Sequence, residues 1–537
     1  MSIQIPNFTG LIPKANDPLL PSNAATIATN CRVDRGSIRP LKGATLAVAT
    51  PSGTLGFAPK SIFKYGSPAW LYWLNANVDV ARSPVPNDAY GRIYYTGGEA
   101  AYPQYTFTGQ PSAGGLPQGL RLGIPQPGAG MISSIVKSGT STGTAYNRYY
   151  VFTYVSPLGE EGPPISAPYL VPGITSTEVA TLTFNTESLT TYNLGAGAKR
   201  RIYRTAQGTN YTTFEFVADV AIGTLTYADS LVDTQLGEIL PSTTWFPPSA
   251  SMIGLKATAN GFFIGFYGNT LFVSEKYMPH AWTPSNELSF PDAITALAVT
   301  TDSIVVFTQG MPYLVTGTSP ASLSAIKIDM PQSVPFRKSV VDMGGYIMAA
   351  SPDGLLHIVQ NNIAVATLDY FTLEQWQAYS PTTMLGFFFE GFYIGFSSTA
   401  AFMFDMRKQP YVLTTLSGFP TFVGGYNDLS TDTLYLIDST GAIYTWETAA
   451  VLSFTWKSKP LRVFPPVCPA CGRIYASGAV NLQLWADGVS VFGPTSIPDM
   501  SVFRLPGGYR ARQFQIQLSG SNPIDSVTIA NAVSELM

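Results

Sequence analysis

The stretch Gly391-Phe-Tyr-Ile-Gly-Phe-Ser-Ser-Thr-Ala-Ala-Phe-Met-Phe404 predicts two short apolar strands joined by a turn of small residues. Similar cassettes recur on both sides of it, at Gly261–Val273, Asp302–Val315, Gly345–Val359 and Asp432–Trp446. The equivalent positions Ile264, Val305, Ile347, Ile394 and Tyr435 are 41, 42, 47 and 41 residues apart. A period of about 40–50 residues with several short strands per unit is typical of β-propeller blades. A propeller is usually a platform, so the repeat alone indicates no enzyme.

The rest of the chain extends this all-β pattern. Aromatic runs in 58–125, such as Trp70-Leu-Tyr-Trp-Leu74, predict the first propeller strands. With the main blades over 249–455 they predict a propeller of about six blades. Residues 1–57 show no clear period and are expected to be an N-terminal extended segment, with a short helical turn over 22–30 capped by Ser22.

Residues 126–248 interrupt the blade pattern. Strand-like runs at 149–155, 199–204, 213–219 and 226–229 are spaced as in a β-sandwich, which we interpret as a domain inserted into the propeller. Residues 456–537 predict a C-terminal β module. It contains a hairpin turning at Asp487-Gly488 and a strand, 513–518, that places Phe514, Ile516 and Leu518 on one face.

Charge is scarce along the whole chain. Only 12% of the 537 residues are charged, about half of the usual share of roughly 25%. This fits a subunit whose surface is covered by neighbours, or a surface that is simply uncharged. The net charge of −3 gives no bulk basic character for gripping nucleic acid. No apolar run is long enough for a membrane span, and the start lacks the pattern of a cleaved signal peptide.

A search for catalytic motifs finds no phosphate-binding loop, no nucleophile elbow and no His-Glu-x-x-His helix. His280, in an expected inter-strand turn, and His357, in an apolar strand, are interpreted as structural. We therefore expect no enzyme, catalytic residue or cofactor. Aspartates recur near the cassette turns and are expected to bond their own turn backbone, with calcium as the alternative. They are Asp302, Asp353, Asp405, Asp432 and Asp438.

Two further groups leave alternatives open. Cys468-Pro-Ala-Cys471 fits two reduced thiols in a turn, an isolated disulfide or half of a metal site. Lys199-Arg-Arg with Arg204 is the one dense basic stretch, and alternation puts Lys199 and Arg201 on one face and Arg200 and Arg204 on the other. It fits either an edge-strand solubility device or a contact to an acidic partner subunit.

Three passages together resemble a known family. The opening holds Phe8-Thr-Gly-Leu-Ile-Pro13, Leu19-Leu-Pro21, Ala24-Ala25, Asn30 and Gly36-Ser-Ile-Arg-Pro40. The insert holds Leu158-Gly-Glu-Glu-Gly-Pro-Pro164, Arg201-Ile-Tyr-Arg-Thr205 and Tyr227-Ala-Asp229. The end holds Phe503-Arg-Leu-Pro-Gly-Gly508, the strand 513–518 and Glu535-Leu536. In this order the passages resemble the tail nozzle proteins of short-tailed bacteriophages, also called tail tubular protein B.

The resemblance implies a fibronectin-like insert and a homohexameric ring at the distal end of the virion tail, assembled in the host cytoplasm. Genome DNA would leave through the ring without sequence recognition. The implied partners are a tail adaptor protein and either tail fibres or a plug protein, and no enzyme activity is implied. A charge-poor lumen suits this role, because many phosphate contacts would make ejection sticky.

Two rival functions remain. A carbohydrate- or receptor-binding propeller would use exposed aromatic clusters, such as Trp70-Leu-Tyr-Trp73, to stack on sugar rings. A propeller glycoside hydrolase would need two carboxylates facing each other within roughly 5–10 Å.

Overall fold

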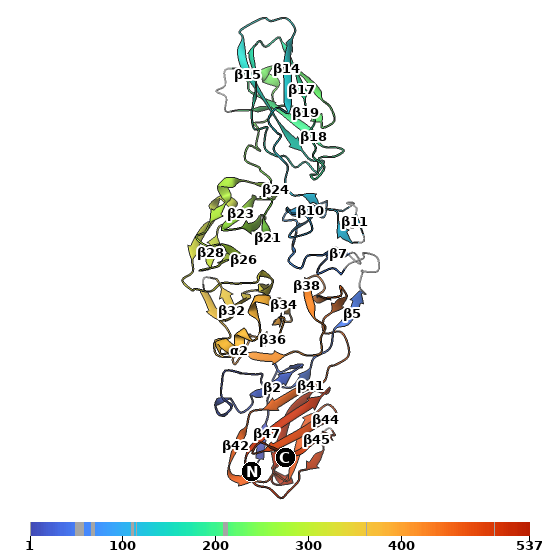
Figure 1. Ribbon diagram of the computed structural model, residues 1–537, viewed down its shortest axis with the longest axis vertical. Coiled ribbons are helices and arrows are strands. Elements are labelled where there is room, and N and C mark those ends of the chain that lie inside the picture. Colours follow the sequence, from blue (N-terminus) through green and yellow to red (C-terminus); the bar gives the residue numbers. More distant parts are fainter. Residues whose placement is uncertain are drawn as a thin grey trace. The chain divides into compact units, whose positions relative to one another are not determined.

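The computed structural model describes residues 2–48, 58–65, 70–108, 112–113, 115–207, 213–360, 362–498 and 500–536. Within these residues the protein is all-β, with a single short α-helix, α2 (Leu373–Gln377), as shown in Figure 1. Residues 49–57, the end of the expected N-terminal segment, lie outside the described residues. None of the described helices has the length and apolar character needed to cross a membrane.

The chain divides into two compact units. The first comprises Met1–Ala76, Val306–Tyr313 and Lys327–Met537, and the second comprises Asn77–Val305 and Leu314–Ile326. The expected insert therefore belongs to the second unit, and the expected C-terminal module belongs to the first.

Each of the five cassettes forms an antiparallel hairpin, as predicted, and supplies the second and third strands of its sheet. The hairpins are β22 (Phe263–Tyr267) with β23 (Thr270–Glu275), β27 (Ser303–Thr308) with β28 (Tyr313–Thr316), β31 (Ile347–Ser351) with β32 (Gly354–Val359), β35 (Phe392–Phe396) with β36 (Ala401–Asp405) and β39 (Thr433–Asp438) with β40 (Ile443–Thr445). Ile264, Val305, Ile347 and Ile394 are all buried. The cassette is apolar because its strands are covered on both faces.

Outer strands complete these sheets. The first and fourth strands are β21 (Ile253–Ala257) and β24 (Met278–Trp282), β26 (Ile294–Val299) and β29 (Ser324–Lys327), β30 (Val341–Asp342) and β33 (Asn362–Val365), β34 (Leu385–Phe389) and β37 (Val412–Thr415), and β38 (Phe422–Asp428) and β5 (Thr45–Val48). A further strand, β25 (Leu288–Ser289), pairs with β23. The last of these sheets thus takes its fourth strand from the start of the chain, where β5 pairs with β40.

The early aromatic runs also form sheets. In the second unit the order is β13 (Leu120–Arg121), β10 (Gln104–Thr106), β9 (Ile93–Thr96) and β8 (Asp79–Arg82), and β11 (Ser112–Ala113) pairs with β12 (Leu116–Pro117). In the first unit β6 (Ser61–Lys64) pairs with β7 (Trp70–Trp73). Adjacent sheets pack on one another, β8 and β9 against β21 in the second unit and β38 against β6 in the first.

The insert consists of two sheets around one core. A three-stranded sheet has the order β14 (Ile132–Ser138), β17 (Val179–Phe184) and β20 (Thr226–Asp229). A four-stranded sheet has the order β16 (Tyr169–Ile174), β15 (Tyr146–Val155), β18 (Lys199–Arg204) and β19 (Glu215–Ala221). Phe152, Leu182 and Ile202 are fully buried between the two sheets.

The C-terminal strands form a second pair of sheets, which contains both chain ends (Figure 1). One sheet contains β2 (Ala25–Thr29), β41 (Phe454–Ser458), β47 (Ala511–Gly520), β44 (Val480–Ala486), β45 (Val489–Ile497) and β42 (Leu461–Val467). It is continuous with the sheet of β34–β37, because β2 also pairs with β37. The other has the order β1 (Ser2–Ile5), β48 (Ile524–Ala530), β43 (Cys471–Ala476) and β46 (Val502–Arg504). We call this pair of sheets the closing sandwich.

Two predictions for the closing sandwich are confirmed. β44 and β45 form the expected hairpin, with Ala486 opposite Val489 and with Asp487 and Gly488 at φ values of 45° and 84°. Two successive left-handed residues are what a two-residue hairpin turn requires. Phe514, Ile516 and Leu518 of β47 all point into the core.

The expected helical turn over 22–30 is wrong. Residues Ala25–Thr29 form strand β2, which pairs antiparallel with β41. Trp456 of β41 supplies one reason, because its ring packs edge-on against Phe8 at 4.9 Å and its indole Nε1 donates to Thr9 O at 3.0 Å. Tertiary packing of the opening segment therefore overrides its weak helical preference.

Candidate functional site

A cluster of buried charged residues lies where the insert meets the neighbouring sheets of the second unit. The turn after β15 places Glu160 and Glu161 side by side, and both are buried. Glu160 accepts a hydrogen bond from Arg92 Nη1 at 2.8 Å, and Arg92 also pairs with Asp88 at 3.0 Å. Burial raises the pKa of Glu160, although Arg92 opposes that rise.

Glu161 is held by a different set of donors, all of which lie in the insert or directly follow it. Its carboxylate accepts hydrogen bonds from Thr153 Oγ1 at 2.8 Å, Tyr203 Oη at 2.7 Å, Ser242 Oγ at 3.2 Å and Arg201 Nη1 at 3.0 Å. Four donors on one carboxylate satisfy its lone pairs and fix its position. Glu161 therefore has a structural role, because its carboxylate holds these four donors together.

The basic stretch 199–204 alternates as predicted, but it is not an edge strand. β18 lies between β15 and β19 in the middle of its sheet. On one face Lys199 and Arg201 pair with Asp219, at 3.2 and 2.8 Å. The interpretation as an edge-strand solubility device is therefore wrong, because carboxylates of the same chain bind these cations within the sheet.

The other face of β18 is buried and charged. Arg204 is fully buried and pairs with Asp229, also fully buried, at 2.9 Å between Nε and Oδ2. Tyr150 Oη donates to the same carboxylate at 2.6 Å, and Arg148 lies 3.6 Å from it. This centre in the sandwich core has all of its charges paired, so it is a structural ionic core.

The two histidines do not form a catalytic pair with a nucleophile. His280 lies in strand β24, contrary to the expected turn, and its ring is buried near Trp245, with centroids 6.1 Å apart. Burial, with a contribution from Arg92, lowers the pKa of His280 to about 4. His357 lies in a strand, β32, as predicted. Its ring packs edge-on against that of Tyr346, with the ring centroids 4.9 Å apart. Among the described residues neither imidazole hydrogen-bonds to a serine, a cysteine or a carboxylate.

The cysteines are free thiols. Cys471 begins β43, where its Sγ lies 3.6 Å from Ala530 O, and burial raises its pKa. Cys468 lies in the preceding loop, 3.8 Å from Pro506 O. In the described part of the chain, no group of three or more His, Cys, Asp or Glu side chains could hold a metal ion.

Some of the cassette aspartates bond their own turns, as expected. Asp438 Oδ1 accepts from the backbone N–H of Thr440 at 2.9 Å and of Ala442 at 3.0 Å. Asp405 accepts from Arg407 N at 2.9 Å, whereas Asp353 instead accepts from Gln332. For Asp302 and Asp432, no such turn bond is found within the described residues.

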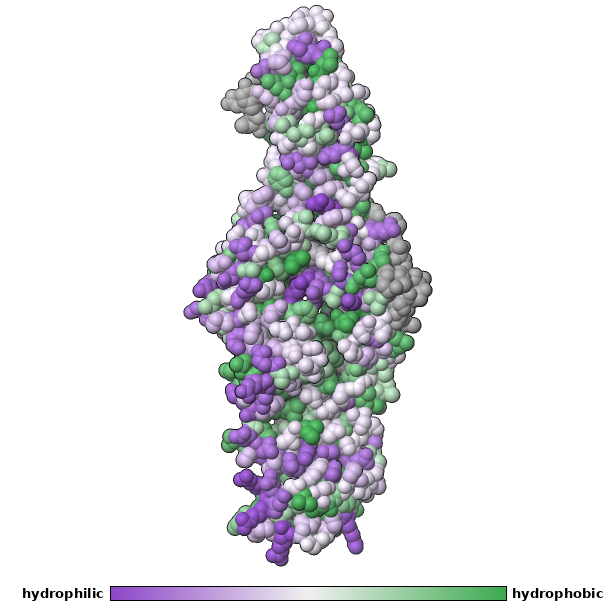
Figure 2. Space-filling model, in the orientation of Figure 1, coloured by the Kyte–Doolittle hydropathy of each residue, from purple (hydrophilic) through white to green (hydrophobic). Residues whose placement is uncertain are grey.

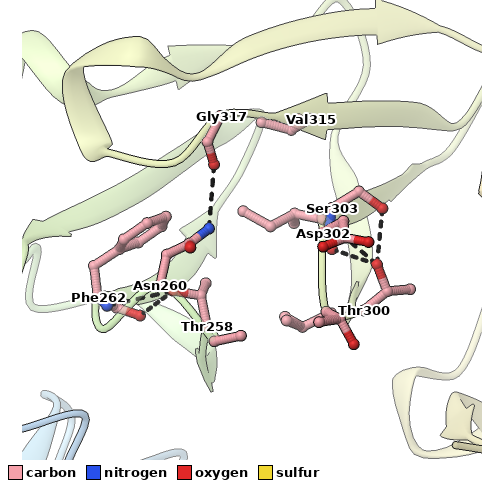
Figure 3. A pocket seen from close by; sticks show the side chains of 12 residues that line it. Thr258, Asn260, Phe262, Thr300, Asp302, Ser303, Val315 and Gly317 are labelled. Atoms are coloured by element: carbon pink, nitrogen blue, oxygen red, sulfur yellow. Dashed lines mark hydrogen bonds between the residues drawn. The ribbon is translucent and has the colours of Figure 1, made fainter.

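Asp302 borders a small pocket in the second unit (Figure 3). The pocket lies between the β21–β22 loop, the β26–β27 loop and the end of β28. Asn260 Nδ2 donates to Gly317 O at 3.4 Å across it, and Thr300 Oγ1 lies 2.9 Å from Ser303 Oγ. Asp302 is the single carboxylate among its lining residues, so this pocket lacks the facing pair that glycoside hydrolysis requires.

The aromatic run 70–73 is not an exposed platform. Tyr72 and Trp73 are buried, and Trp70 packs edge-on against Tyr435 at 4.9 Å and Tyr426 at 6.5 Å. These ring contacts stabilise the packing of β7 against the sheet of β38–β40. Sugar stacking on this run would need the rings to leave their packing partners.

An arginine of the opening segment makes a contact that sequence reasoning missed. Arg32 is buried between Phe389 and Phe392, with its guanidinium carbon 5.8 and 5.1 Å from the ring centroids. Its two terminal nitrogens pair with Glu390 and Glu447. Glu390 directly follows β34, Glu447 lies just after β40, and both are left-handed, with φ of 47° and 55°. No local pattern marks this triad, because Arg32 is 358 and 415 residues away from the two glutamates.

Exposed arginines gather on the closing sandwich. Arg462 and Phe464 point outward from β42, and Arg512 of β47 lies beside them around one surface hollow that also includes Asp487. The Phe464 side chain is 82% exposed. Figure 2 shows hydrophobic residues exposed among hydrophilic ones over the face in view. A count of charges by region could have indicated this surface, because residues 456–537 hold more Lys and Arg than Asp and Glu.

No protein-family model and no curated protein matches the sequence. Solved structures give only distant likenesses. PorZ, a surface component of the type-IX secretion system of Porphyromonas gingivalis, is 10% identical over 87% of this chain and 48% of its own, with a TM-score of 0.29. The extracellular domain of a putative one-component system from B. thetaiotaomicron is 10% identical over 67% and 48%, with a TM-score of 0.27. The chain thus spans about half the length of these two proteins. Hsv2 of Kluyvelomyces marxianus is 7% identical over 53% and 90%, with a TM-score of 0.26.

Proposed function

We propose that this chain is a structural protein of a short-tailed bacteriophage virion, in which six copies form the nozzle ring of the tail and genome DNA leaves through that ring. Under this proposal the sheets built on the cassettes are blades of a β-propeller, and β5 closes the last blade from the start of the chain. The insert is the fibronectin-like domain. The chain performs no catalysis.

The observation that carries the proposal is the way the two ends of the chain are joined. The opening and closing passages, which carry much of the family resemblance, build one sandwich together. β1 pairs with β48, β2 pairs with β41, and Ile38 bridges Ile524. Passages that lie hundreds of residues apart thus belong to one structural element, which is expected if they were inherited as one module.

The buried charges support a structural role. Glu160, Glu161 and Asp229 are each bound to arginine and hydroxyl donors of this chain, so their hydrogen-bonding capacity is used for packing the fold. A general acid or base must lie within hydrogen-bond reach of its substrate, whereas these carboxylates are buried against donors of this chain.

The direct test is to purify the phage particles that encode this chain, to identify the chain in them by mass spectrometry, and to locate it by electron microscopy. We expect six copies around a channel at the distal end of the tail. Particles without the chain, or a chain located in the capsid or at a fibre tip, would overturn the proposal.

A genetic test adds a functional measurement. Particles made without the chain should fail to retain or deliver DNA, and the wild-type gene should restore infectivity. A chain lacking residues 1–48 should not restore it, because β1, β2 and β5 are lost together. Replacement of the exposed Lys408 by Ala is the matched control and should restore it fully. Full infectivity without the chain would contradict the proposal.

A further inference from the structure

Arginine is used differently on the closing sandwich and elsewhere. The buried arginines Arg32, Arg92 and Arg204 are ion-paired, and the buried Arg200 donates to backbone carbonyls. On the closing sandwich Arg462, Arg504, Arg510 and Arg512 are exposed, and no described carboxylate lies within ion-pair distance of them. Four unpaired guanidinium groups on one module leave capacity for an acidic partner.

Three residues define the surface concerned, which we call the Arg–Phe surface. Arg462 and Phe464 alternate on the outer side of β42, and Arg462 lies opposite Gln513 of β47, next to Arg512. The nearby Asp487 makes no ion pair with the arginines of this surface within the described residues. Its Oδ1 accepts the backbone N–H groups of Arg512 at 3.1 Å and Gln513 at 2.9 Å, so it holds the backbone of β47.

The composition of the Arg–Phe surface favours a protein partner. Arginine and aromatic residues are enriched in the centres of protein interfaces, and lysine is depleted there. A nucleic-acid groove would instead require a longer basic track with stacking rings. Phe464, the most exposed large apolar side chain of the described residues, supplies the anchor that a protein pocket would bury.

A complementary surface lies on the same chain, around helix α2. Leu368 and Leu373 are 61% and 57% exposed, and the neighbouring Asp369 and Glu374 are exposed as well. No described cation pairs with either carboxylate. We call these four residues the Leu–acid surface. The wider region agrees, because residues 249–455 hold fifteen Asp and Glu against seven Lys and Arg, whereas 456–537 hold four against seven.

We propose that the Arg–Phe surface of one copy binds the Leu–acid surface of the next copy. The two surfaces differ, so the contact is heterologous and repeats around a closed ring or along a filament. Phe464 packs between the two leucines, and the two arginines meet the two carboxylates. This inference rests on the proposed ring and names the residues that join its subunits.

Charge reversal tests the proposal on the full-length chain. Arg462→Glu with Arg512→Glu should weaken self-association by about tenfold or more in sedimentation at low salt, and Asp369→Arg with Glu374→Arg should do the same. Phe464→Ala should weaken it without changing the charge. Lys42→Glu with Lys408→Glu makes an equal charge change at exposed positions elsewhere and should leave association as in the wild type. Circular dichroism checks that each variant is folded.

Mixing provides the decisive readout. An equimolar mixture of the two charge-reversed variants matches Glu against Arg at one contact and keeps the original pairing at the next, so alternating assembly should be restored. Wild-type chain that stays monomeric, or a mixture that does not recover, overturns the inference. Binding to a duplex DNA oligonucleotide that is lost on Arg462→Glu with Arg512→Glu, while self-association persists, overturns it in favour of a nucleic-acid site. These outcomes leave the tail assignment to the particle experiment, so the two proposals can fail separately.

Discussion

The insert and the closing sandwich are both made of two packed sheets, yet they place their charges on opposite sides. In the insert, the side chains of Arg204 and Asp229 are fully buried and paired at 2.9 Å. In the closing sandwich the corresponding interior is apolar, with Phe514, Ile516 and Leu518 fully buried, and the arginines lie outside. Buried pairs are costly to desolvate and costly to break, whereas exposed charges contribute little to stability. The insert uses its charges in internal ion pairs, whereas the closing sandwich keeps its arginines on the surface, where a partner could bind them.

The sharpest way to break this comparison is to remove one arginine from each sandwich. Arg204→Ala leaves Asp229 buried without its main partner, which should cost about 3–5 kcal/mol of local stability. Arg462→Ala should change stability by no more than about 0.5 kcal/mol, because its side chain is solvated. Native-state hydrogen exchange of the β15–β18 and β42–β47 amides measures the two effects in the full chain. Equal losses at both sites would contradict the comparison.

A second prediction concerns pH. The pKa of His280 is lowered to about 4 in the folded state. In the unfolded chain this pKa has its ordinary value, so the unfolded chain binds the proton first as the pH falls. Stability of this region should therefore decrease between pH 6.5 and pH 4, by up to about 3 kcal/mol. Hydrogen exchange of β24 measures the slope. The closing sandwich should lack this contribution, because residues 456–537 contain no histidine.

The control for the pH effect is His280→Gln, which should remove the slope. Burial raises the pKa of Glu160, the partner of Arg92, so protonation of that group favours the folded state as the pH falls. The difference between the wild type and His280→Gln isolates the histidine from this opposing effect. An unchanged slope in the variant would show that other groups carry it.

A third prediction tests backbone geometry in the closing sandwich. Gly488 lies at φ 84° in the β44–β45 turn with open space around its α-carbon. Gly488→Ala should cost about 1–2 kcal/mol through conformation alone. Gly345→Ala is the matched control, since Gly345 is equally open but not left-handed, and it should have almost no effect. Thermal unfolding compares the melting temperatures of the two variants. A lower melting temperature for Gly488→Ala alone would show that stability here depends on the backbone conformation of the turn and not on an ion pair.

The sequence predicted most of what depends on neighbouring residues. The cassette hairpins, the alternation of β47 and β18, and the turn at Asp487-Gly488 all follow from short patterns, because strand and turn preferences are local. It failed where distant segments decide the outcome. Residues 25–29 became a strand because β41 was available as a partner, and His280 lies in β24, not in a turn.

The candidate sites show the same limit. The buried pairing of Arg204 with Asp229 and the triad around Arg32 join residues from different strands or sheets, and no spacing in the sequence announces them. The aromatic run 70–73 forms a strand, as predicted, but the exposure that the rival sugar-binding function would need is missing, because Tyr426 and Tyr435 from another sheet pack against Trp70. Exposure is a property of the assembled fold, so composition alone could not supply it.

The smallest expected effect shows whether burial alone separates the two sandwiches. Lys199 lies on the insert, half exposed, and its Nζ is 3.2 Å from Asp219 Oδ2. Lys199→Met keeps most of the aliphatic stem and removes the charge, and it should cost no more than about 0.5 kcal/mol at low salt. At 1 M salt, where the screening length is about 3 Å, the cost should disappear. If it does, an exposed charge on the insert behaves like the arginines of the closing sandwich, and the contrast between the two modules comes from burial and not from the sheets themselves. A loss comparable to that of Arg204→Ala would instead mean that the outer face of β18 is part of the ionic core.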